Sequence, residues 1–189
     1  YTSDPALLGT LGTVDNLYGL WMCSDTALAG DVSFAAQLGN ISCLELAVAG
    51  GTDLSPVQQC TALRELRIRT DGAVRLDLTG LENLFSLEMQ GGGDGTLDLQ
   101  VPGSMPSLRR LSLRDGQLPE LGLLANLPGL ESLDLMGPNF HLLDLNQLSL
   151  APALRGLSIG DTSGWSKRLD LAPLAACPSL EVCNYPRGV

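Results

Sequence analysis

Positive charge is scarce in this sequence. Of 189 residues, 11 are Lys or Arg and 21 are Asp or Glu, so the formal net charge is −10, and residues 1–63 contain no Lys or Arg. Binding to nucleic acid or to an anionic membrane surface relies on clustered Lys and Arg over a wide surface. The composition therefore argues against nucleic acid and the membrane as partners.

Histidine is limited to His141, and the cysteines show no C-x-x-C spacing. The five cysteines are Cys23, Cys43, Cys60, Cys177 and Cys183. A zinc site needs closely spaced thiolates or imidazoles, and catalysis needs a positioned acid, base or nucleophile. We therefore expect no metal, no cofactor and no catalytic residue, so the chain itself is not expected to be an enzyme. The odd number of cysteines favours a reducing, cytoplasmic location, and the alternative is a secreted or cell-surface location.

Long apolar runs are missing too, as are a basic-then-apolar leader and a starting Met. A membrane span needs about 18 or more consecutive apolar residues, and a signal peptide needs a short apolar core behind a basic start. The chain begins partway through what looks like a repeat. We expect residues 1–189 to be a single domain, the C-terminal region of a longer protein, with further domains upstream of Tyr1.

Leucine, in contrast, recurs in a regular figure, L-x-x-L-x-L, that is found eight times with steps of 21 to 26 residues. The first positions of the figure are Leu17, Ile41, Leu63, Leu84, Leu108, Leu130, Leu154 and Leu180. This spacing resembles the leucine-rich repeat family, whose period is about 20 to 29 residues. The resemblance covers nearly the whole chain.

The figure predicts a short strand in each repeat, because alternating side chains in x-L-x-L-x place leucines inward and the x residues outward. The resemblance implies an α/β fold, a right-handed leucine-rich repeat solenoid of about eight repeats. A curved parallel β-sheet is expected on its concave face, with short helical turns, strands and loops on the convex face. Ser55 is predicted to cap a convex helical turn that has Pro56 in its first turn. The thiols of Cys60, Cys177 and Cys183 fall at apolar positions and are predicted to be buried.

The sequence departs from the family in its turns. Many leucine-rich repeats carry an Asn three residues after the last leucine, but the corresponding residues here include Ala49, Asp71 and Gly92. Backbone groups in the turns must then be satisfied in another way. The glycines at 50, 51, 72, 91, 93 and 95 predict tight turns that depend on glycine.

Two segments, Asp53-Leu-Ser-Pro-Val57 and Asp170-Leu-Ala-Pro-Leu174, resemble internalin-like repeats of bacteria and the C-terminal repeats of bacterial NACHT-type signalling NTPases. The NACHT resemblance implies a ligand-sensing region that acts in innate immunity or defence, beside upstream signalling domains. The alternatives are an internalin-like adhesin and the targeting region of an effector enzyme.

The outward positions are the candidates for binding a protein or peptide partner, since stacked repeats present them as one surface. These candidate residues are Trp21, Glu45, Glu65, Arg67, Arg69, Glu88, Gln90, Arg110, Ser112, Arg114 and Asp134. Two interpretations apply to their charges. Glu45, Arg67 and Glu88 alternate in sign on adjacent strands and predict an internal salt-bridge ladder. Arg69 and Arg114, on either side of Gln90, predict a grip for an acidic partner segment.

Overall fold

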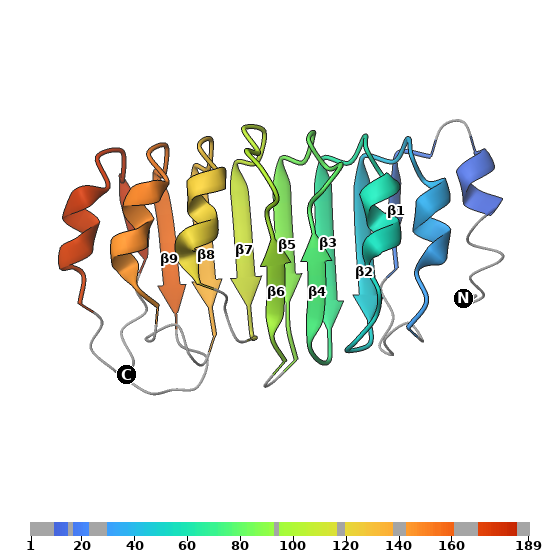
Figure 1. Ribbon diagram of the computed structural model, residues 1–189, viewed down its shortest axis with the longest axis horizontal. Helices are drawn as coiled ribbons and strands as arrows, with labels where there is room; N and C mark the ends of the chain where they lie inside the picture. Colours follow the sequence, from blue (N-terminus) through green and yellow to red (C-terminus); the bar gives the residue numbers. More distant parts are fainter. Residues whose placement is uncertain are drawn as a thin grey trace.

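The computed structural model describes residues 10–14, 17–22, 30–92, 95–116, 120–137, 143–160 and 170–184. Eight strands form one parallel sheet in the order β1-β2-β3-β5-β7-β8-β9-β10 (Figure 1). Their bounds are β1 (Gly19–Trp21), β2 (Cys43–Val48), β3 (Glu65–Thr70), β5 (Ser86–Gln90), β7 (Arg110–Arg114), β8 (Ser132–Met136), β9 (Gly156–Gly160) and β10 (Val182–Asn184). Each strand overlaps the second half of one copy of the leucine figure, so the predicted eight repeats are confirmed.

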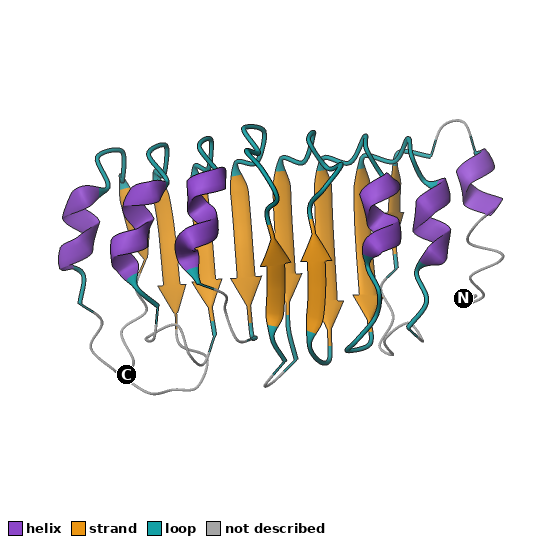
Figure 2. Ribbon diagram, in the orientation of Figure 1, coloured by secondary structure: helices purple, strands orange, loops and turns teal. Residues whose placement is uncertain are grey.

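The other side of the solenoid carries short 3₁₀ helices at both ends and two strands in the middle (Figure 2). The helices are η1 (Thr10–Thr13), η2 (Ser33–Gln37), η3 (Ser55–Gln59), η4 (Leu121–Asn126), η6 (Leu145–Leu150) and η7 (Ala172–Ala176). Between η3 and η4, strands β4 (Val74–Asp77) and β6 (Leu97–Gln100) pair in parallel. We call this the helical side. Across the described ranges, no helix has the length and apolarity that a membrane span requires.

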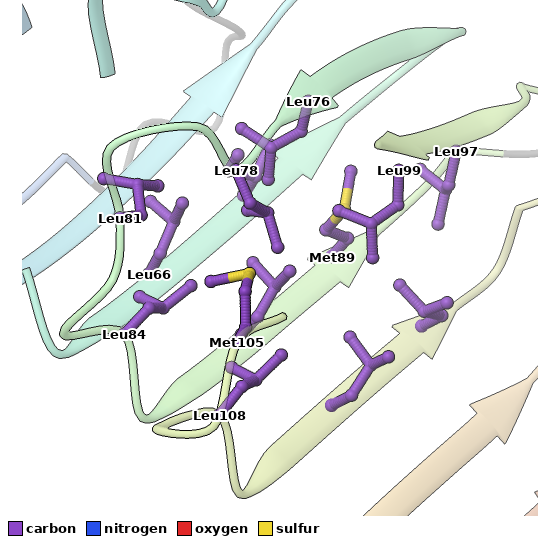
Figure 3. Packing of buried hydrophobic residues seen from close by; sticks show 14 of the residues in the cluster. Leu66, Leu76, Leu78, Leu81, Leu84, Met89, Leu97, Leu99, Met105 and Leu108 are labelled. Carbon is purple, nitrogen blue, oxygen red and sulfur yellow. The ribbon is translucent and has the colours of Figure 1, made fainter. Parts of the chain in front are cut away.

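The core lies between the two sides and is built mostly of leucine. Strand β3 alternates strictly, with Leu66 and Ile68 buried and Arg67 and Arg69 exposed, as the leucine figure predicts. On the helical side, Leu76 and Leu78 and the equivalent leucines of the next repeat close the core from the opposite direction (Figure 3). Each fully buried leucine contributes roughly 1.5–3 kcal/mol by removing apolar surface from water. The repeats therefore stabilise one another rather than fold around one centre.

The predicted burial of cysteines is confirmed at Cys60 and Cys177 and wrong at Cys183. The Cys60 side chain is fully buried and its Sγ donates to the carbonyl of Ala35 at 3.2 Å. Burial raises the pKa of the Cys60 thiol to about 11. Cys183 does occupy an inward position, opposite Leu157, but it is exposed because β10 pairs only with β9 in the described part of the chain.

The prediction that Ser55 caps η3 is also wrong. Ser55 is the first helical residue, and the carboxylate of Asp53 accepts its backbone N–H at 2.9 Å and its hydroxyl at 3.0 Å. These bonds to the backbone and hydroxyl of Ser55 lower the pKa of Asp53. Asp170 accepts the N–H of Ala172 in the same way ahead of η7. The repeated Asp-Leu-x segment is thus an Asx turn that starts a helix.

Glycine takes the place of the missing asparagine ladder in the turns that follow the strands. Glycines of successive turns lie against one another so closely that no side chain fits between them, and these are Gly50, Gly72, Gly95, Gly116 and Gly137. A side chain also satisfies a backbone group in one of these turns, where the Asp71 carboxylate accepts the N–H of Gly50 at 2.8 Å. The prediction of glycine-dependent turns is confirmed at Gly50, Gly72 and Gly95, at Gly91, which lies against Gly116, and at Gly51, which has a φ of 80°. Gly93 lies outside the described residues.

Candidate protein-binding face

The outward side chains of the eight-stranded sheet form three parallel rows, which together we call the concave face. The middle row runs Trp21, Glu45, Arg67, Glu88, Ser112, Asp134, Ser158 and Asn184, each directly opposite the next in the strand register. The row toward the strand ends includes Arg69, Gln90 and Arg114, and the row toward the strand starts includes Glu65, Ser86 and Arg110. The register brings all eleven sequence-predicted site residues onto this one face.

Glu45 is the most enclosed of these residues, with only 5% of its surface exposed. Its carboxylate oxygens lie 3.9 Å from Nη1 of Arg67 and 3.1 Å from Nη2 of Arg69. On the next strand, Nε of Arg67 lies 3.5 Å from Oε2 of Glu88. The predicted salt-bridge ladder is therefore confirmed, and Arg69 adds a diagonal contact that strand register alone does not suggest.

A second polar cluster is centred on Asp134. Its Oδ2 accepts Nε of Arg114 at 2.9 Å and the hydroxyl of Ser112 at 3.1 Å, and Arg114 Nη2 contacts the same oxygen. Arg114 Nε also lies 3.0 Å from the Ser112 hydroxyl. Beside this cluster, Gln90 donates to the carboxylate of Asp115 at 3.1 Å. These contacts fix the side-chain positions in advance of any ligand.

Arg69 and Arg114 were predicted to grip an acidic partner segment, but both already form ion pairs within this chain. The register places them on either side of Gln90, as the sequence predicted. Each guanidinium, however, already contacts a carboxylate of this chain, Arg69 that of Glu45 and Arg114 that of Asp134. An incoming carboxylate would have to share or displace these partners, so their role in gripping a ligand remains a prediction.

Trp21 is exposed, with 61% of its surface accessible, and its indole ring lies over Gly19 of the same strand. A Cβ at Gly19 would overlap the ring, so the absence of a side chain there makes room for it. Trp21 sits directly opposite Glu45 in the register. The face thus pairs an exposed aromatic at one end with an ordered charge network beside it.

A row that the sequence reasoning missed lies along the edge where the strands start, and we call it the rim. It consists of Tyr18, Ser42, Arg64, Phe85, Arg109, Glu131, Arg155 and Glu181, each the first x of an L-x-x-L figure. The carbonyl of each of the first seven accepts two successive N–H groups of the next repeat. Ion pairs join Arg109 to Glu131 and Arg155 to Glu181, both at 3.6 Å. The signal in the sequence that could have identified this row is its constant position, the first x of each L-x-x-L figure.

The helical side holds an open depression of about 680 Å³ beside η3, over β4 and β6. Polar residues line it, including Asp53, Asp77 and Asp98, with Arg75 3.7 Å from Asp98. Backbone and hydroxyl groups of Thr79 donate to Asp77 and lower its pKa. Within the described ranges, no group of three or more His, Cys, Asp or Glu could hold a metal ion.

The described cysteines, Cys43, Cys60, Cys177 and Cys183, are free thiols. His141 and Cys23 lie outside the described residues.

No protein-family model and no curated protein matches the chain. Among solved structures, internalin C2 from Listeria monocytogenes is similar over 93% of this chain and 74% of its own, with a TM-score of 0.65 and 22% identity. A second internalin of that organism, inlF, matches 95% of this chain and 64% of its own, with a TM-score of 0.45 and 16% identity. The parallel sheet, the leucine core and the 3₁₀ turns agree with the first of these matches. The chain has the leucine-rich repeat fold, similar in structure to a Listeria internalin over most of its length.

Proposed function

We propose that this domain is a protein-recognition module that binds a protein or peptide partner through its concave face. The observation that carries the proposal is Trp21, which is 61% exposed in the middle row of the sheet, where the other residues are polar. Exposed tryptophan is costly in water and is enriched among the residues that dominate binding energy at interfaces. Strand register places it in line with Glu45 and Arg67, so one ligand can contact all three.

The charge networks of the face suit specificity more than raw affinity. Arg67, Arg69 and Glu45 hold one another in place, as do Arg114 and Asp134. Preordered charges of both signs select a partner with the complementary pattern and reject others by like-charge repulsion. The domain itself acts as a binding module and not as an enzyme. Any catalytic activity belongs to domains outside this chain.

We further propose that the recognised partner is a foreign or invader-derived protein, and that the parent protein is a cytoplasmic signalling NTPase of NACHT type. The odd number of cysteines, which favours a reducing compartment, supports this context, while the Asp-Leu-x-Pro segments at Asp53–Val57 and Asp170–Leu174 resemble both families. A secreted internalin-like adhesin is the alternative, favoured by the likeness in fold to internalin C2. The coding sequence upstream of Tyr1 decides between them: a G-x-x-x-x-G-K-[ST] loop supports the NTPase, and a signal peptide supports the adhesin.

The binding face is tested by site-specific photo-crosslinking. A benzophenone side chain is placed at Ser112 on the concave face and, as the matched control, at the exposed Ala125 in η4 on the helical side. We expect a partner to crosslink from position 112 and not from position 125. Trp21→Ala should then weaken its affinity about tenfold or more, since a hot-spot residue contributes over 1 kcal/mol. Equal capture from both positions, or unchanged affinity, would overturn the proposal.

A further inference from the structure

An arginine–phenylalanine cluster lies where the rim meets the strand-start row of the concave face, at the starts of β3, β5 and β7. Phe85 is 40% exposed, and Cζ of Arg110 lies 5.5 Å from the centre of its ring. Arg64 precedes β3 on the neighbouring repeat. We propose that Arg64, Phe85 and Arg110, here called the rim site, bind an acidic segment of a protein partner. This inference rests on the proposed recognition function and names the chemistry of its ligand.

Backbone hydrogen bonds hold the rim site in a fixed geometry. The N–H groups of Phe85 and Ser86 both donate to the carbonyl of Arg64, at 2.8 and 3.0 Å. The carbonyl of Phe85 in turn accepts the N–H groups of Arg109 and Arg110, at 2.9 and 3.1 Å. The backbone of Phe85 is therefore bound to the repeats on both sides, which fixes where its side chain leaves the sheet, beside Arg110.

The two arginines of the rim site differ from the other described arginines in having no internal acid. Six arginines lie within 4.0 Å of a carboxylate, namely Arg67, Arg69, Arg75, Arg109, Arg114 and Arg155. Among the residues that the structure describes, Arg64 and Arg110 contact no carboxylate within that distance. Arg109, which follows Phe85 along the rim, is paired with Glu131, so Arg64 and Arg110 are the two described arginines left for an external carboxylate.

An acidic peptide is the ligand that fits these groups. A guanidinium presents a fork of N–H donors that matches a carboxylate, and a ring beneath it orients that fork while leaving it free to bind. The exposed ring edge of Phe85 accepts an apolar side chain of the same segment. A wholly acidic protein would be repelled by the net charge of −10, so the acidic residues must form a short local segment.

Glu65 limits where this segment lies. Its carboxylate is in the same row as Ser86 and Arg110, on the β3 side. Repulsion from Glu65 keeps an incoming carboxylate off the strand-start row at β3 and favours its approach to Arg64 from the rim. The ligand is therefore expected to run along the strand starts, past Phe85.

The test uses a short fluorescein-labelled peptide of alternating Asp and Leu, with a matched peptide that has Asn for each Asp. Fluorescence anisotropy measures binding to the parent chain, to the double variant Arg64→Ala/Arg110→Ala, and to Arg155→Ala as the rim control. We expect the parent to bind the Asp peptide, with an affinity that falls as salt is raised. The double variant should bind about tenfold more weakly, because two charge-assisted contacts are lost. Arg155→Ala should bind like the parent.

Phe85→Leu gives a second readout, since it keeps an apolar side chain and removes the ring face. We expect a loss of roughly threefold, as for an exposed cation–π contact. Equal binding of the Asp and Asn peptides, or parent-like binding by the double variant, would overturn the rim site. If the crosslink from Ser112 still captures its partner in that case, the recognition face stands and the rim assignment alone fails.

Discussion

The backbones of Gly50 and Gly72 touch across consecutive turns of the solenoid: a Cβ built on Gly50 would lie 2.9 Å from Cα of Gly72, and the reverse distance is 3.0 Å. Neither glycine has a positive φ. The requirement for glycine here comes from space and not from backbone conformation. Close approach of the turns is therefore part of what sets the spacing between repeats.

Gly72→Ala should destabilise the domain by about 1–3 kcal/mol, the usual cost of adding a methyl group to a fully packed position. Gly122→Ala is the matched control, because a Cβ there meets no atom within 4 Å and Gly122 lies inside η4. That control should be neutral or more stable by about 0.4–1 kcal/mol. Urea unfolding measures both. Equal stabilities for the two variants would show that the glycine contacts do not constrain the repeat spacing.

Leu111→Ala should lower the free energy of unfolding by about 2–5 kcal/mol. Leu111 is buried in the leucine core, so removal of its side chain leaves a cavity. Leu111→Asp should unfold the array locally or wholly, because it places an unpaired charge among leucines. Ser112→Ala, one residue on and facing outward, should change stability by less than about 1 kcal/mol. Thermal melts followed by circular dichroism compare the three. A parent-like melt for Leu111→Asp would mean that the assigned strand register is wrong.

Glu45 and Arg69 should show a coupling free energy of about 1–2 kcal/mol in a double-mutant cycle. The expected value lies between those of exposed and buried ion pairs, because Glu45 is enclosed while the Arg69 side chain is 58% exposed. The control cycle uses Arg155 and Glu181, both well exposed, and should give about 0–1 kcal/mol. Equal coupling in the two cycles would contradict a special role for the enclosed carboxylate.

Cys60 should make stability fall as the solution becomes alkaline. Its pKa is raised from 9.0 to about 11 in the folded state, so the unfolded chain loses this proton first. The stability that the buried, neutral thiol contributes is fully present below pH 9.0 and is lost as the pH rises through about 11. The slope approaches about 1.4 kcal/mol per pH unit for one proton. Chemical denaturation from pH 8 upward, compared with Cys60→Ala, measures it; identical slopes would exclude Cys60 as the source.

Sequence reasoning recovered the sheet because a strand with inward leucines needs only a period of two inside each repeat. It predicted the helical turn at Ser55 and Pro56, which is η3, but not which repeats carry a strand on the helical side. Leu76-Asp-Leu78 and Leu169-Asp-Leu171 have the same sequence, but the first belongs to strand β4 and its exit, whereas Asp170 and Leu171 lead into η7. The next residues differ, since Thr79-Gly80 forms a turn with Gly80 at φ 83°, whereas Ala172 begins a helix with Pro at its start. Whether a repeat forms a strand or a helix on the helical side therefore depends on the residues that follow Leu-Asp-Leu and on the length of the repeat.

For the binding face, register predicted which residues are neighbours but not which of them bond. Glu45 reaches Arg69 diagonally as well as Arg67 directly, and that choice depends on side-chain rotamers that the spacing of leucines does not encode. Phe85 is not among the predicted site residues, because the predicted strand x-L-x-L-x begins after the first x of L-x-x-L. The paired N–H contacts to the carbonyls of that row hold it at the edge of the sheet, beside the concave face.

The pairing of β4 with β6 affects how the solenoid bends. At these two repeats, parallel ladders join neighbours on both sides of the coil, with four register pairs on the helical side. No comparable ladder links the 3₁₀ helices of the described ranges. Any change of curvature stretches or compresses the helical side, and between β4 and β6 that motion would break backbone hydrogen bonds. The middle of the domain is therefore a stiff segment, and flexing to fit a partner is expected at the flanks, where neighbouring helices can slide.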